Sequence, residues 1–250
     1  MRRRLKLVKP VRLETLPQAQ ARNLQRIDAL TDRSPEIAAA LEACDPDASC
    51  CLVICAVCSR RDRRRLIREL LAIAESCPGQ HEFATIFLDS FPAGKLVDAD
   101  IKLAHERLRK RLQRYGFGGS LLIGGTEVNW DGAAKSWTLH IHLLAIGVPP
   151  AAWKRLTSAL RGTGPKYPVK VQLLRNPARQ ISYSIKFHTY FRPKSPSHGI
   201  RSGAAALPPD RLAELAEWSS AYSFDDFIFL SGARRRGGQI VVEVTKFIRM

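Results

Sequence analysis

The chain has 250 residues, of which 45% are hydrophobic and 25% are charged. This content is normal for a globular protein and excludes wholesale disorder, and no apolar run reaches the roughly 18 residues that a membrane-spanning helix needs. The 40 Lys and Arg against 23 Asp and Glu leave a net charge of +17, which favours polyanionic partners. The basic N-terminus lacks the long apolar core of a secretory signal, so we expect a cytoplasmic protein with no membrane partner.

Residues 1–78 are predicted to form a basic, cysteine-rich helical region. Ser34 is a suitable N-cap for a helix over 35–41. The arginine run 60–65 leads into an amphipathic helix that ends at Cys77, before Pro78 and Gly79. Cys77 itself is expected in the core.

The other five cysteines all lie between residues 44 and 58. Without an export signal, such clustering favours a metal or free thiols over a disulfide framework. Structural zinc prefers two to four residues between paired thiolates, which Cys55 and Cys58 satisfy, whereas the pair Cys44 and Cys50 is slightly long. Cys50 and Cys51 compete for one ligand position, and we favour Cys50. The alternative interpretation is that these cysteines are small buried hydrophobic residues. The candidate Zn²⁺ ligands are therefore Cys44, Cys50, Cys55 and Cys58.

The remaining chain divides into a region of mixed helices and strands, 79–192, and a C-terminal region, 193–250. In the first, the hydrophobic patterns predict strands at 83–88, 120–130, 136–146 and 169–174, and helices at 96–115, 150–161 and 179–190. The last of these is rich in Ile, Tyr and Phe, so a strand is the alternative there. In the second, a Pro-, Ser- and Gly-rich loop at 193–209 precedes a helix at 210–221 and a basic hairpin around 232–238.

The predicted strands 120–130 and 136–146 carry the most informative pattern. Strand side chains alternate between faces, so His140 and His142 lie on one face and the apolar residues around them on the other. If Trp130 pairs with Trp137 across the hairpin, Glu127 lies opposite His140. A slip of one residue would place polar beside apolar side chains, which is disfavoured. We therefore predict that two imidazoles and one carboxylate form a divalent-cation site. The alternative is a pair of ordinary exposed histidines.

A second pattern follows about forty residues later, where Tyr183 and Lys186 have the spacing of residues that share a helical face. Tyrosine can attack a phosphodiester if a cation withdraws charge from the phosphate. By itself this pattern is weak and is typical of an amphipathic surface helix.

Taken together, Glu127, His140 and His142 followed by Tyr183 and Lys186 resemble the HUH endonucleases. The order and separation are most similar to plasmid rolling-circle replication initiators with one catalytic tyrosine. The resemblance covers roughly residues 83–190. The family's first strand usually carries several threonines, whereas the corresponding strand here has only Thr85.

This resemblance implies an α+β fold in which helices flank an antiparallel central sheet. It also implies metal-dependent nicking of single-stranded or extruded DNA at a replication origin, with a host helicase as a candidate partner. His140 and His142 would bind Mn²⁺ or Mg²⁺, with Glu127 as third ligand or as an acid–base group. Tyr183 would form a 5′-phosphotyrosine, assisted by Lys186. Tyr190 lies too far along the chain to be a good second nucleophile.

Basic side chains elsewhere are candidate phosphate contacts, because few acidic residues lie nearby to neutralise them. Besides the run 60–65, they are Arg107, Lys110, Arg111, Arg114, Arg234, Arg235 and Arg236. Two other functions remain open. One is an HUH transposase; a conjugative relaxase fits less well, because its usual third histidine has no candidate near the pair. The other is a non-enzymatic, zinc-stabilised DNA-binding regulator, which would not need Tyr183 or the two histidines.

Overall fold

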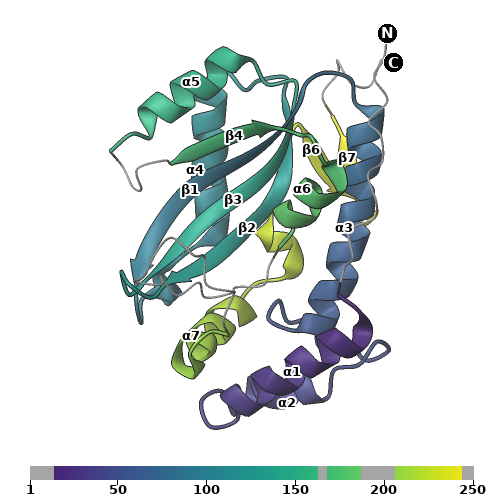
Figure 1. The fold of residues 1–250 in the computed structure, drawn as a ribbon, viewed down its shortest axis with the longest axis vertical. Coiled ribbons are helices and arrows are strands. Elements are labelled where there is room, and N and C mark those ends of the chain that lie inside the picture. The colour runs from purple at the N-terminus through teal and green to yellow at the C-terminus, as the bar shows by residue number, and fades with distance from the viewer. Residues whose placement is uncertain (1–13, 163–167, 187–205, 244–250) are drawn as a thin grey trace, which may run out of the picture.

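The centre of the protein is a five-stranded antiparallel sheet flanked by helices (Figure 1). The computed structural model describes residues 14–162, 168–186 and 206–243. The strand order is β4–β1–β3–β2–β5. The strands are β1 (His81–Pro92), β2 (Leu121–Asp131), β3 (Ser136–Ile146), β4 (Val169–Leu173) and β5 (Ile228–Ser231). The α+β class and the antiparallel sheet agree with the prediction.

The hairpin of β2 and β3 has the predicted register. Trp130 pairs with Trp137, and Glu127 pairs with His140. On its other side β3 pairs with β1, where Thr85 lies opposite His142, and β1 carries an irregularity between Phe87 and Asp89. Because side chains alternate along each strand, this register fixes one largely apolar face and one face that carries Glu127 and both histidines.

The apolar face is covered by α4 (Ile101–Arg114) and α5 (Pro150–Ala159), and Figure 1 shows α4 behind the sheet. The prediction of one helix over 96–115 is corrected here. A short 3₁₀ turn, η1 (Leu96–Asp98), comes first, and Asp100 then caps α4 by accepting the backbone N–H of Leu103. The buried contacts on this face involve Ile86, Leu108, Leu112, Ile141, Leu143, Trp153 and Leu156.

The opposite face is covered by α3 (Ala56–Ser76) and by α6 (Pro177–Ser184), which lies in front of the sheet in Figure 1. Their apolar side chains pack on one end of the sheet, through Leu66, Leu70, Phe83, Ile123, Leu144, Ile146, Ile181 and Ile185. Cys77 belongs to this cluster, as predicted. Further along the same face lie Glu127 and His140, so α6 ends beside them.

The N-terminal helices α1 (Leu16–Leu30) and α2 (Pro35–Glu42) pack with the start of α3 and with α7 (Pro209–Ser220). After α7 comes the 3₁₀ turn η2 (Phe224–Phe227), and β5 then joins the central sheet beside β2. The sheet therefore draws strands from both sides of the expected boundary at 192/193. The basic hairpin consists of β6 (Ala233–Arg236) and β7 (Gln239–Val242). None of the helices in the described part of the chain has the length and apolar character that crossing a membrane requires.

Candidate metal centres and the adjoining groove

Glu127, His140 and His142 converge on one face of the sheet, as their strand positions predict. One ligand atom from each lies within 4.8 Å of the others. Nε2 of His142 and Oε2 of Glu127 are joined by a hydrogen bond of 2.8 Å. Glu127 and His142 are both buried, with exposed fractions of 3% and 4%. We call these three residues the Glu–His–His group; its mixed oxygen and nitrogen donors can hold a metal ion.

The protonation states suit a cation site. Burial alone would raise the pKa of Glu127, but the hydrogen bond from His142 and the positive charge of Lys186 outweigh it, so the pKa lies below its usual value. Burial lowers the pKa of His140 to about 4, although Glu127 opposes this shift. At neutral pH the group thus holds an ionised carboxylate and a neutral imidazole, which are the forms that bind cations.

Neighbouring polar side chains orient this group. A hydrogen bond of 2.9 Å joins Oγ1 of Thr85 to Nδ1 of His142, and the amide of Asn129 contacts His140. Nζ of Lys186 lies 3.6 Å from Oε1 of Glu127. Contacts of this kind fix the ring orientation of a metal-binding histidine. Thr85, the single threonine of its strand, thus lies beside His142.

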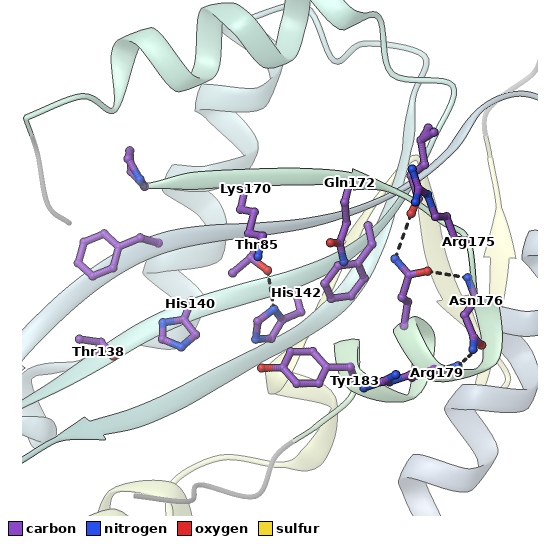
Figure 2. Close-up of a pocket in the computed structure, with 15 residues that line it drawn as sticks. Thr85, Thr138, His140, His142, Lys170, Gln172, Arg175, Asn176, Arg179 and Tyr183 are labelled. Carbon is purple, nitrogen blue, oxygen red and sulfur yellow. Dashed lines mark hydrogen bonds between the residues drawn. The ribbon is translucent and has the colours of Figure 1, made fainter. Parts of the chain in front are cut away.

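Tyr183 lies next to the Glu–His–His group. Its ring centroid is 4.8 Å from that of His142, and 40% of the side chain is exposed. In Figure 2 its hydroxyl points along the sheet towards His140. Nζ of Lys186 is 5.5 Å from the tyrosine ring.

The predicted helix over 179–190 is corrected, because α6 ends at Ser184. Lys186 comes after that end, so a turn at Ile185, and not a shared helical face, brings it to Tyr183. Tyr190 lies outside the described residues.

A groove of about 1180 Å³ runs from the two histidines past Tyr183 to the edge strand β4 (Figure 2). It holds basic and amide side chains that the sequence analysis did not select: Lys170, Gln172, Arg175, Asn176, Arg179 and Gln180. The sequence pattern could have identified two of these residues. Lys170 and Gln172 alternate along β4 and pair with Thr85 and Phe83, which places them on the same face as His142.

The predicted phosphate contacts lie elsewhere. Arg107, Lys110, Arg111 and Arg114 are exposed on α4, on the other face of the sheet from the Glu–His–His group. Arg234 and Arg235 on β6 pair with Glu243 and Asp225, both at 2.8 Å, and Arg236 is exposed on the same strand. The structure therefore brings together the predicted metal ligands and Tyr183, but not these basic residues with them.

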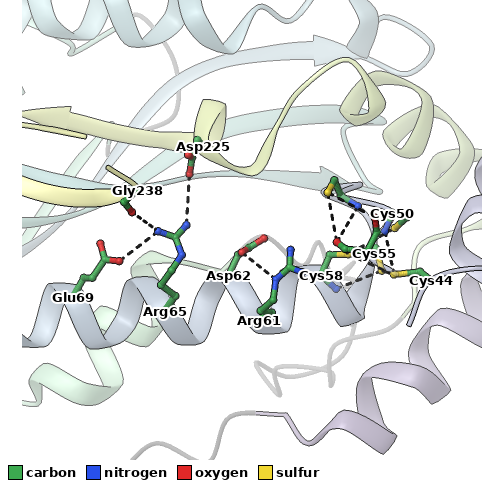
Figure 3. A network of polar contacts seen from close by, with 12 residues as sticks. Cys44, Cys50, Cys55, Cys58, Arg61, Asp62, Arg65, Glu69, Asp225 and Gly238 are labelled. Atoms are coloured by element: carbon green, nitrogen blue, oxygen red, sulfur yellow. Dashed lines mark hydrogen bonds and ion pairs between the residues drawn. The ribbon is translucent and has the colours of Figure 1, made fainter. Parts of the chain in front are cut away.

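The second candidate centre consists of Cys44, Cys50, Cys55 and Cys58, whose sulfur atoms all lie within 4.8 Å of one another (Figure 3). Sulfur separations of 3.5, 3.7 and 3.5 Å join Cys44 to Cys58, Cys50 to Cys58 and Cys55 to Cys44. All four thiols are free of disulfides. Of the two adjacent cysteines, Cys50 belongs to the group, as predicted. Cys51 is exposed and is not part of it.

Backbone and side-chain N–H groups point at these sulfurs. Cys55 accepts from the amide of Asn23 at 3.2 Å and from the backbone N–H of Cys58 at 3.5 Å. Hydrogen bonds from Cys50 and Cys58 lower the pKa of Cys55, whereas burial raises the pKa of Cys44 to about 11. Cys55 is also the N-cap of α3, where the helix dipole favours an anion. The cluster can therefore hold a cation, and Asn23 ties α1 to it.

Comparison with known proteins adds no relative: no family model, no curated protein and no solved structure matches this chain.

Proposed function

We propose that this protein is a metal-dependent DNA endonuclease with an HUH-type core, which initiates replication by nicking single-stranded DNA. The observation that carries the proposal is the position of Tyr183. A half-exposed phenol lies 4.8 Å, ring to ring, from His142 of the Glu–His–His group, at the edge of a basic groove. A purely structural tyrosine would not need an ionised carboxylate and two imidazoles beside it.

The reaction is a transesterification. The phenol oxygen of Tyr183 forms a bond to phosphorus, and the bond from phosphorus to the 3′ oxygen breaks. The phenol proton leaves to solvent, and the departing oxygen takes up a proton, which gives a 5′-phosphotyrosine and a free 3′-OH. An unperturbed phenol has a pKa near 10, so the attack needs assistance. Lys186, 5.5 Å from the ring, favours the phenolate. A cation held by the Glu–His–His group, Mn²⁺ or Mg²⁺, would withdraw charge from the phosphate.

The groove supplies the path for the strand. Lys170, Arg175 and Arg179 line it together with Tyr183, so phosphates there would run past the phenol. The bases of a single strand are free to stack or bend, whereas a duplex would have to open before one phosphate reached the floor of the sheet. The exposed arginines of α4 are on the other face, so they would contact flanking DNA at most.

The cysteine cluster is best explained as a structural Zn²⁺ site. Four sulfurs at the Zn–S distance of about 2.3 Å in a tetrahedron are about 3.8 Å apart. Three of the six sulfur separations, at 3.5 to 3.7 Å, are close to that value and far from the roughly 2.05 Å of a disulfide. All six lie within 4.8 Å. All four positions are protein ligands, which is typical of a structural and not a catalytic zinc.

The decisive experiment incubates the protein with 5′- and 3′-labelled single-stranded DNA from its own replicon, with Mn²⁺ or with EDTA. Wild type should give a free 3′-OH fragment and a protein–DNA adduct that survives denaturing electrophoresis, and EDTA should abolish both. Tyr183→Phe should bind DNA normally but give neither product. Tyr115→Phe, the same change on the opposite face of the sheet, should behave as wild type.

An adduct formed by Tyr183→Phe would show that another residue is the nucleophile. If the wild-type protein binds the DNA without metal and never cleaves it, the result would instead favour the non-enzymatic regulator. A transposase would nick its own element ends and not an origin, so comparing these two DNAs separates the remaining alternative.

A further inference from the structure

Tyr183 is held on a very short helix. The helix α6 has eight residues, and a helix of this length is marginal without outside contacts. Its last carbonyl groups have no partner within the helix itself. Whatever satisfies those carbonyls therefore also determines where the phenol and the following Lys186 lie.

Arg63 of α3 supplies this contact. Its Nε donates to the carbonyl of Ile185 at 2.7 Å, and its Nη2 donates to the carbonyl of Ser182 at 3.4 Å. These two residues bracket Tyr183, and Ile185 directly precedes Lys186. The guanidinium has a planar, fixed geometry and a permanent positive charge, which complements the negative end of a helix dipole.

Three other arginines of the run 60–65 are part-buried and contact neighbouring segments of the fold. Arg60 and Arg64 donate to the carbonyl of Glu14, and Arg65 donates to Glu69 and to the carbonyl of Gly238. Arg61 is exposed and pairs with Asp62, so the expectation that the run contacts DNA stays a prediction. Within this run, Arg63 donates hydrogen bonds to the end of α6.

The helix α3, which carries Arg63, is held in place on both sides of this residue. Five residues before it is Cys58, about 7.5 Å along the helix, and Cys58 belongs to the cysteine cluster. Shortly after it, Leu66 and Leu70 are fully buried against the sheet. Arg63 thus projects from a rigid stretch of α3 between a candidate metal centre and the core.

We propose that Arg63 is a positioning residue, which holds the end of α6 so that Tyr183 and Lys186 lie correctly beside the Glu–His–His group. Its kinetic consequence rests on the proposed nicking activity, whereas its structural consequence does not. A displacement of about 1 Å at a reacting group can slow a reaction by 10²-fold, so loss of this contact acts on rate and not on DNA affinity.

The test compares Arg63→Gln with Arg68→Gln, the same change at an exposed position of α3 whose Nε contacts only its own helix. Hydrogen exchange of the peptide 177–186 should become at least about tenfold faster in Arg63→Gln and stay unchanged in Arg68→Gln. Exchange in β2 and β3 should not change. Single-turnover nicking should slow by about 10- to 100-fold with DNA affinity within a few-fold of wild type. Arg63→Lys keeps the charge, so it should recover part of the rate, and it provides a second variant if Arg63→Gln does not fold.

If the peptide 177–186 exchanges hydrogen in Arg63→Gln at the same rate as in the wild type, the proposal is wrong. Faster exchange with an unchanged nicking rate would also overturn it, because Tyr183 would then not depend on the contact. If wild type itself does not nick, the proposed function fails, while the exchange measurement still decides whether Arg63 positions α6.

Discussion

Gly124 of β2 offers a test of how tightly the Glu–His–His group depends on its backbone. A Cβ at this position would lie 1.8 Å from the carbonyl oxygen of His142 and 2.9 Å from Cα of Leu143. Both obstacles are backbone atoms, so no side chain can rotate out of the way. Gly124→Ala therefore requires β2 and β3 to move apart at the point where His142 is held.

The size of this effect follows from the contact. Real Cβ contacts essentially never fall below 3.0 Å, so the His142 oxygen must retreat by about 1.2 Å. Metal–ligand distances tolerate only about 0.2 Å. We expect the affinity for Mn²⁺ to fall at least tenfold and the free energy of unfolding to fall by about 1–3 kcal/mol, the usual range for overpacking.

Calorimetric titration with Mn²⁺ measures the affinity, and chemical denaturation measures the free energy of unfolding. Gly118→Ala is the matched control, because a Cβ there meets nothing within 4 Å. It should leave both quantities near wild type. Equal Mn²⁺ affinity and equal stability in Gly124→Ala would refute the close strand approach, and with it this account of the site.

Three further outcomes are expected. Burial lowers the pKa of His105 to about 4. The unfolded chain therefore takes up a proton below about pH 6.5 that the folded protein does not, so His105 should remove roughly 2 kcal/mol of stability between pH 7.5 and 4.5. His140, whose pKa is lowered to the same value, should act in the same direction. Urea denaturation of His105→Gln should show a correspondingly shallower pH dependence, and identical slopes would contradict this assignment. Zinc should copurify at about one equivalent; Cys58→Ser should lose it and melt at a lower temperature, whereas Cys51→Ser should retain it by elemental analysis. Arg179→Ala should reduce the slope of log K against log salt for single-stranded DNA by about 0.7, while Arg107→Ala leaves it unchanged; the reverse result would place the strand on α4.

The sequence predicted the central hairpin well because two constraints act on the same strands. Polar and apolar side chains alternate in both β2 and β3, and only one register keeps the two sets on separate faces. The pairing of Glu127 with His140 follows from this constraint, and the structure has the same pair. The helix α1 carried a signal that was missed, since Thr15 and Gln18 form a capping box at its start.

Other features depend on contacts that are distant in sequence. The strand β5 has four residues and is defined by pairing with β2, about one hundred residues earlier, so its own pattern is too short to place it. The end of α6 at Ser184 is set by the packing of Ile181 and Ile185 and by Arg63, not by a breaker residue. The groove likewise exists only once β4 has joined the edge of the sheet and α6 has packed on the face that carries His140 and His142.

The paired indoles at the end of the hairpin give it an optical signature. The rings of Trp130 and Trp137 are 5.1 Å apart at an interplanar angle of 57°, and the guanidinium of Arg211 from α7 lies over Trp130. Two indoles this close and this inclined couple their electronic transitions, which produces a paired positive and negative band in the circular dichroism spectrum. Because the same register that brings the two indoles together sets Glu127 opposite His140, this band reports in solution on the strand alignment beneath the candidate metal site.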